Sequence, residues 1–110
     1  MTRPASLLVL LLAAALEAAG DALLRNGLHS HSLPIRVLLF LAGAAALFLY
    51  GLTVNTPPWD FGRVIGLYIV FFFIVAQLIS WLVFKQPPTT PLLLGGSLIV
   101  AGGIVLSLAR

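Results

Sequence analysis

The chain has 110 residues, of which 61% are hydrophobic and only 8% are charged, whereas a soluble domain of this size needs far more charge on its surface. Its formal net charge is +3, but the six basic residues are spread singly along the chain, which argues against the basic stripe with aromatic platforms that nucleic-acid binding requires. The chain contains no cysteine, so disulfides and thiolate metal sites are excluded. Lipid is therefore the expected solvent.

Four apolar stretches have the length of about 20 residues that a membrane-spanning helix needs. They run from Ala5 to Leu24, from Pro34 to Val54, from Gly62 to Phe84 and from Thr90 to Ala109. Each is predicted to be a helix, because backbone groups in lipid must satisfy their own hydrogen bonds. The prediction is an all-α integral membrane protein with a single four-helix transmembrane domain over residues 1–110. Cleavage of the first stretch as a signal peptide is disfavoured, because its apolar pattern continues through "DALLRNG".

The loops that join these stretches are short, so neighbouring helices are expected to be antiparallel. Basic residues then fall equally at the two ends of the bundle: Arg3, Arg63 and Arg110 at one end, and Arg25, Arg36 and Lys85 at the other. Orientation in a membrane follows the difference in Lys and Arg between the two sides, and here that difference is nil. We therefore expect copies to insert both ways and to pair as an antiparallel homodimer. The alternative is a coincidental balance and one fixed orientation.

Glu17 lies slightly past the middle of the first predicted helix, after ten residues, Leu7 to Leu16, without a polar side chain. A carboxylate at this depth is costly and marks an ion or substrate path by default. It can hold a proton or a cation, but not both, so we interpret Glu17 as a group that binds protons and substrate in turn. The alternative is a carboxylate that only bonds to a neighbouring polar side chain.

Asp21 follows Glu17 by four residues and shares its helix face. Gly20 lies beside them, among several alanines, and small residues let a ligand or another backbone come close. Both are therefore candidate site residues. Asp21 is interpreted either as a second cation-binding group or relay, or as an ion-pair partner of Arg25, which follows four residues later.

The second and third predicted helices supply further candidates with polar or aromatic side chains. Gln77, Ser80 and Trp81 share one face of the third helix. Tyr68 lies nine residues before Gln77, on the opposite part of the helical wheel. Gln77 is interpreted as a substrate contact or as a hydrogen-bonding link between helices. Tyr50 and Trp81 are interpreted either as cavity residues or as members of an interfacial aromatic belt, to which Trp59 is also assigned.

The fourth predicted helix carries glycines at a spacing of seven, Gly95 with Gly102 and Gly96 with Gly103. Such a stripe allows close helix packing, here expected between subunits. The chain shows no nucleotide-binding loop, no Ser/His/Asp set and no metal-ligand spacing. We therefore expect no enzymatic activity, no metal and no cofactor.

These motifs give the chain a resemblance to the small multidrug resistance family of four-helix, proton-coupled exporters, over nearly its full length. "ALEAAGDALLR" is similar to the family's first-helix motif, with Glu17, Gly20 and Arg25 at the acidic, glycine and basic places. "SWLVFKQPPTTP" is similar to the end of the family's third helix, and "GGSLIVAGGIVLSLAR" to its fourth, the usual dimer contact. The resemblance implies an antiparallel homodimer in which Glu17 from both subunits binds substrate and protons alternately.

The third helix departs from the family's drug exporters, which carry a tyrosine and a tryptophan one turn apart in a glycine-rich motif. Here "GRVIGLYIVFFF" has Ile65 and Tyr68 at about those places, and Arg63 is unusual there. This segment looks more like a less characterised branch of the wider drug/metabolite transporter superfamily. Aromatic caging of a quaternary cation is therefore not expected from it.

The sequence thus predicts a multi-pass protein of the plasma (inner) membrane that exchanges protons for a small cationic or amphiphilic compound through Glu17. One alternative is a non-drug superfamily member, such as a flippase subunit for a lipid-linked substrate or a helper protein that pairs with another chain. A purely structural membrane protein is a further alternative.

Overall fold

The computed structural model describes residues 2–108, which fold into four helices. They are α1 (Arg3–Leu28), α2 (Leu33–Val54), α3 (Phe61–Leu82) and α4 (Thr90–Leu108). Each helix is long and apolar enough to span a membrane, so the predicted all-helical membrane architecture is confirmed at this level. It is the architecture of a multi-pass membrane protein.

The helix ends differ by a few residues from the predicted stretches. α1 begins two residues earlier and ends four residues later than expected, and α3 ends at Leu82 instead of Phe84. The early start of α1 follows from Thr2, whose side-chain oxygen accepts a hydrogen bond from the backbone N–H of Ala5 at 3.3 Å. Pro4 then lies in the first turn, where its missing N–H leaves no bond unmade. The predicted end of α4, Ala109, lies outside the described residues.

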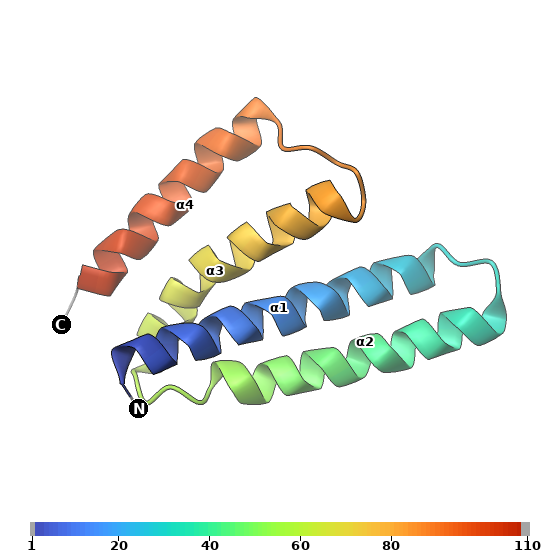
Figure 1. Ribbon diagram of the computed structural model, residues 1–110, viewed down its shortest axis with the longest axis horizontal. Coiled ribbons are helices and arrows are strands. Elements are labelled where there is room, and N and C mark those ends of the chain that lie inside the picture. Colours follow the sequence, from blue (N-terminus) through green and yellow to red (C-terminus); the bar gives the residue numbers. More distant parts are fainter. Residues whose placement is uncertain (1, 109–110) are drawn as a thin grey trace.

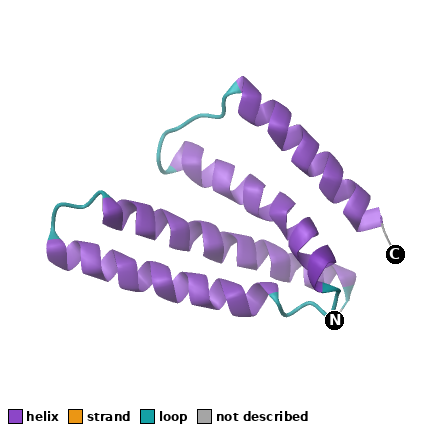
Figure 2. Cartoon of the chain, turned by 180° about the vertical axis from the view of Figure 1, so that it is seen from behind, coloured by secondary structure: helices purple, strands orange, loops and turns teal. Residues whose placement is uncertain are grey.

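The helices run up and down, as the short loops predict (Figure 1). α1 packs against α2 and α3, whereas α4 packs along α3 and diverges from the other two helices, as both views show (Figures 1 and 2). The start of α1 and the α2–α3 loop lie at one end of the bundle, and the α1–α2 and α3–α4 loops lie at the other. The Arg3 guanidinium donates a hydrogen bond to the Ser107 carbonyl oxygen, which joins the ends of α1 and α4.

A small core forms where α1, α2 and α3 meet. Its buried members are Leu10, Ala13, Ala14, Val54, Val64, Leu67 and Tyr68. Because the α1 residues at its centre are alanines, α3 can approach the α1 backbone closely. The core therefore positions α3 side chains directly against the middle of α1.

Gly20 and Gly43 bring α1 and α2 into backbone contact. A Cβ atom built on either glycine would lie 3.1 Å from the carbonyl oxygen of the other, closer than ordinary van der Waals contact. Gly20 thus faces α2 at this crossing. Its expected part in substrate binding stays a prediction.

The glycines of α4 divide between two faces. Gly96 and Gly103 are buried against α3, where an added Cβ would collide with Phe73 and Val70 respectively. At Gly95 and Gly102 an added Cβ would meet nothing within 4 Å. One pair therefore packs inside the chain, whereas the other leaves a smooth strip on the outer side of α4. Packing of these glycines between subunits stays a prediction.

Three arginines near the loops lie over aromatic rings, an arrangement that lets a cation sit beside apolar surface. The guanidinium carbons are 5.0–5.5 Å from the ring centroids, in the pairs Arg25–Phe84, Arg36–Phe40 and Arg63–Trp59. Arg110 lies outside the described residues, so the balance of basic residues between the two ends stays a prediction.

Candidate functional site

Glu17 is held by a tyrosine from the neighbouring helix α3. The hydroxyl of Tyr68 donates a hydrogen bond to Glu17 Oε1 at 2.8 Å and lies 3.4 Å from the carbonyl oxygen of Ala13. Tyr68 is only 3% exposed, whereas Glu17 is half-buried. The carboxylate therefore has one fixed partner on its core side, and it remains accessible on the other.

The ring of Tyr68 packs against two further aromatic rings. The Tyr50 ring, from α2, lies with its centroid 5.5 Å from that of Tyr68. The Phe72 ring, one turn further along α3, lies 6.1 Å away and nearly parallel. Offset aromatic contacts at these separations are favourable. Each of the three core helices thus contributes one polar side chain to a single cluster: Glu17, Tyr50 and Tyr68.

The cluster is suited to holding a proton or a cation. An ionised carboxylate accepts hydrogen bonds at both oxygens, and a tyrosine O–H that points at it stabilises this form. When the carboxyl group carries a proton, it can itself donate. The hydroxyl of Tyr68 has a second acceptor nearby in the Ala13 carbonyl, so its hydrogen need not go unpaired when Glu17 changes state.

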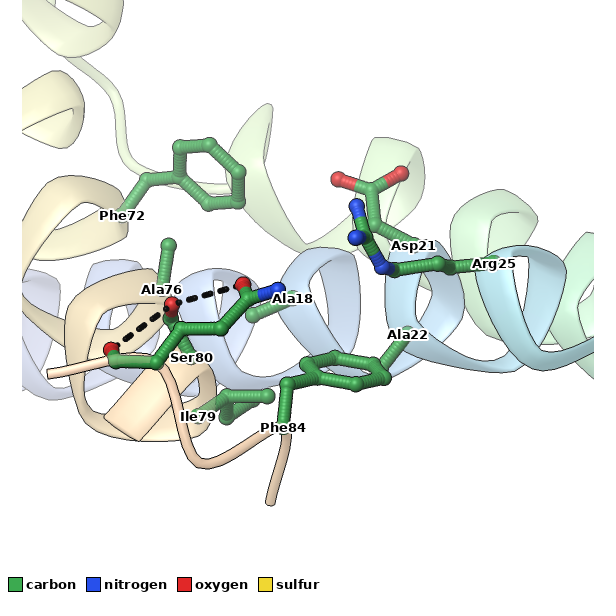
Figure 3. Close-up of a pocket in the computed structure, with 10 residues that line it drawn as sticks. Ala18, Asp21, Ala22, Arg25, Phe72, Ala76, Ile79, Ser80 and Phe84 are labelled. Carbon is green, nitrogen blue, oxygen red and sulfur yellow. Dashed lines mark hydrogen bonds between the residues drawn. The ribbon is translucent and has the colours of Figure 1, made fainter. Parts of the chain in front are cut away.

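Asp21 opens into a cavity of about 260 Å³ between α1 and α3, one helical turn from Glu17 toward the α1–α2 loop. Figure 3 shows its lining. Asp21 and Arg25 both reach it from α1, and Phe84 reaches it from the segment after α3. Within residues 2–108, no ion pair joins Asp21 to Arg25. The guanidinium of Arg25 lies instead 5.3 Å from the centroid of the Phe84 ring.

A tight turn after α3 forms the far wall of this cavity. Lys85, two residues beyond the α3 cap residue Val83, adopts a left-handed backbone conformation with φ 56°. The Gln86 backbone N–H then donates to the Ser80 carbonyl oxygen at 2.9 Å, and the Ser80 hydroxyl lies 3.4 Å from two Gln86 oxygens (Figure 3). This turn places Phe84 and Gln86 opposite Asp21.

Two candidates from the sequence lie away from Glu17. Gln77 lines a second, largely apolar groove of about 530 Å³ between α3 and α4. This agrees with the helical wheel, which puts Tyr68 and Gln77 on opposite sides of α3. Trp81 is 53% exposed on the outer surface. The structure therefore brings Glu17, Tyr50 and Tyr68 together, and leaves Gln77 and Trp81 outside that cluster.

Sequence reasoning missed three residues that complete the Asp21 cavity, Phe72, Phe84 and Gln86. It placed Ser80 on the face of Gln77, but Ser80 lines this cavity and Gln77 lines the other groove. Phe72 could have been found, because it lies four residues after Tyr68 and so on the same face of α3. The positions of Phe84 and Gln86 depend on the turn at Lys85, which no sequence pattern indicated.

The chain was also compared with known proteins. No protein-family model, curated protein or solved structure matches it significantly.

Proposed function

We propose that the protein is a secondary transporter of the small multidrug resistance type, which exchanges protons for a small cationic or amphiphilic compound. Glu17 is the group that protons and substrate share. The observation that carries this proposal is its geometry: a half-buried carboxylate midway along an apolar helix, bonded to Tyr68 at 2.8 Å on one side only. If Glu17 had only a structural role, we would expect it to be fully enclosed by polar partners, because a carboxylate that is accessible from lipid is costly.

Tyr68 gives the exchange a way to keep its hydrogen bonds paired. In the proton-free state its hydroxyl bonds to Glu17, as observed. When a proton or a cation takes that carboxylate oxygen, the hydroxyl turns toward the Ala13 carbonyl, 3.4 Å away. Since unpaired polar groups are expensive in this environment, the second acceptor lowers the cost of changing occupant.

The proposed working unit is an antiparallel homodimer in the plasma (inner) membrane. Two features of α4 support a partner on its outer side. Within the described residues α4 packs along α3 and has one further contact, the hydrogen bond from Arg3 to the Ser107 carbonyl oxygen, and Gly95 and Gly102 leave its other face open. A second copy packed there would cover apolar surface that the single chain leaves exposed, since close packing of small residues favours helix association in lipid.

The test is transport by protein reconstituted in liposomes with an imposed proton gradient. Glu17→Gln keeps the size of the side chain but cannot cycle a proton, so uptake of a fluorescent cation should fall to the level of empty liposomes. Asp60→Asn is the matched control, because Asp60 lies just before α3, outside the cluster, and it should leave transport unchanged. Full transport by Glu17→Gln would refute the proposal.

A second candidate, a flippase subunit or helper protein that pairs with another chain, is favoured by the groove between α3 and α4. Its lining is mostly apolar and includes Phe73, Leu92 and Val100, with Gln77 as a polar group. Such a groove suits a lipid tail. Measuring the molecular mass of the purified protein in a lipid mimic distinguishes the two candidate functions. A stable monomer that dimerises only with a different chain would favour this second candidate.

A further inference from the structure

The cavity beside Asp21 carries two opposite charges on adjacent turns of α1. Asp21 and Arg25 are four residues apart, a spacing at which such side chains readily form an ion pair. Within the described residues they do not, and Arg25 lies over the ring of Phe84 instead. In Figure 3 both charged groups project to the same side of α1, toward the cavity. The cavity thus offers one anion and one cation that are not joined to each other.

This pairing of charges selects against simple ions. A bare cation that approaches Asp21 also meets the field of Arg25, and a bare anion at Arg25 meets that of Asp21. Asp21 and Arg25 are both exposed at the open side of the cavity, so screening reduces these repulsions, but each still opposes the binding of a single charge. A ligand with both charges, separated by a few bonds, gains both attractions and meets neither repulsion. The cavity is therefore complementary to a zwitterion.

The remaining walls fit a short zwitterionic group in size and polarity. Ala18, Ala22 and Ala76 leave room between the helices, and the whole cavity measures about 260 Å³. Ser80 and Gln86 add neutral hydrogen-bonding atoms on the far wall. Phe72 and Phe84 provide apolar surface for a carbon stem.

We propose that this cavity binds a zwitterionic group, with its ammonium against Asp21 and its phosphate or carboxylate against Arg25. The guanidinium suits an oxyanion because it can donate two parallel hydrogen bonds. The same chemistry is present in a soluble amino phosphate and in the headgroup of phosphatidylethanolamine. The site is distinct from the Glu17 cluster, and binding there does not depend on the proposed transport function.

The test measures binding to the purified full-length protein in neutral detergent by calorimetry. Three probes are compared: phosphoethanolamine, ethanolamine as the cation alone, and methyl phosphate as the anion alone. Phosphoethanolamine should bind about tenfold more tightly than either half, because each charged contact contributes. In a parallel arm, protein in nanodiscs is analysed by native mass spectrometry for retained phosphatidylethanolamine or phosphatidylglycerol. If the source is lipid, only phosphatidylethanolamine should be retained.

Asp21→Asn and Arg25→Gln should each weaken the binding found in either arm by about tenfold. Arg36→Gln is the matched control, because Arg36 also lies over an aromatic ring, at 5.5 Å, but outside the cavity, and it should change nothing. Glu17→Gln should also retain binding, which separates this proposal from the transport proposal.

The double exchange Asp21→Arg with Arg25→Asp keeps one charge of each sign and should restore most of the affinity lost in the single variants. It therefore tests the pair even where a single variant folds poorly. Ethanolamine binding as tightly as phosphoethanolamine would overturn the proposal. So would binding that is unaffected by both single variants, or the absence of binding in both arms.

Discussion

Alanine in place of Gly43 should separate α1 from α2 at their closest approach. A Cβ atom at this position would lie 3.0 Å from two side-chain carbons of Leu24 and 3.1 Å from the carbonyl oxygen of Gly20. Leu24 can shift its side chain at little cost. The Gly20 oxygen cannot, because it belongs to the α1 backbone, so the helices must move apart by a few tenths of an ångström.

Overpacking of this kind costs about 1–3 kcal/mol. It is offset in part by the better helix propensity of alanine, about 1 kcal/mol in water. Gly51→Ala in the same helix measures that second contribution alone, because an added Cβ there meets nothing within 4 Å. The difference between the two variants, about 1–3 kcal/mol, is therefore the cost of the contact itself.

The assay is reversible unfolding in mixed micelles, in which a denaturing detergent is titrated and helix content is followed by circular dichroism. Gly43→Ala should unfold at a lower denaturant fraction than Gly51→Ala. Combining Gly43→Ala with Leu24→Ala in a double-mutant cycle separates the side-chain contact from the backbone contact. If Gly43→Ala and Gly51→Ala differ by less than about 0.5 kcal/mol, the experimental error of additivity, the helices do not meet through these glycines.

Three further substitutions test the cluster, the core and the outer face of α4. Tyr68→Phe removes a donor that stabilises the ionised form of Glu17 by about 1.5–3 kcal/mol, so protons should compete more strongly and half-maximal cation binding in a calorimetric titration should need a pH about 1–2 units higher; an unchanged pH dependence would remove Tyr68 from the site. Because protons compete for Glu17, this binding should also fall as the pH falls in wild-type protein, and lose that dependence in Glu17→Gln. Ser6→Ala deletes a buried hydroxyl that has no hydrogen-bond partner among the described residues, so its melting temperature in detergent should equal or exceed that of wild type, and a clear drop would reveal a missed partner. Gly102→Leu fills the open strip of α4 and should lower the dimer fraction in chemical cross-linking several-fold, whereas an unchanged fraction would place the subunit contact elsewhere.

The helices could be predicted because the bilayer imposes their length and apolarity on the sequence. Only the ends of the helices differ from the prediction. At the start of α1 the difference follows from Thr2 and Pro4, whose capping effect is local. The opposite facing of Tyr68 and Gln77 could be predicted as well, since nine residues make two and a half turns of a helix. Such features depend on one helix at a time.

The partners of each side chain could not be predicted, because they depend on which helices touch. The pairing of Tyr68 with Glu17 requires α3 to cross α1 at its alanines. The apolar residues of a membrane helix do not determine which other helix packs against it. The separation of Arg25 from Asp21 depends on a ring, Phe84, that is placed by the left-handed turn at Lys85. Non-glycine residues adopt that conformation rarely, so a lysine gives no signal of it.

The polar groups of the bundle follow one interface and lead toward one end of it. Glu17, Asp21 and Arg25 recur every four residues on the α1 face that looks toward α3, and the Asp21 cavity lies on the loop side of Glu17. On the other side, the way is closed by Leu10 and the alanines of the core, which are fully buried. In a single chain the polar side chains beside Glu17 thus continue toward the loop end of α1, whereas the packed core closes the other direction. If Glu17 exchanges protons for substrate as proposed, the second route must come from a rearrangement of that core or from an inverted copy of the chain. An inverted copy would supply it without breaking the packed core, so the proposed antiparallel pairing is compatible with the proposed exchange.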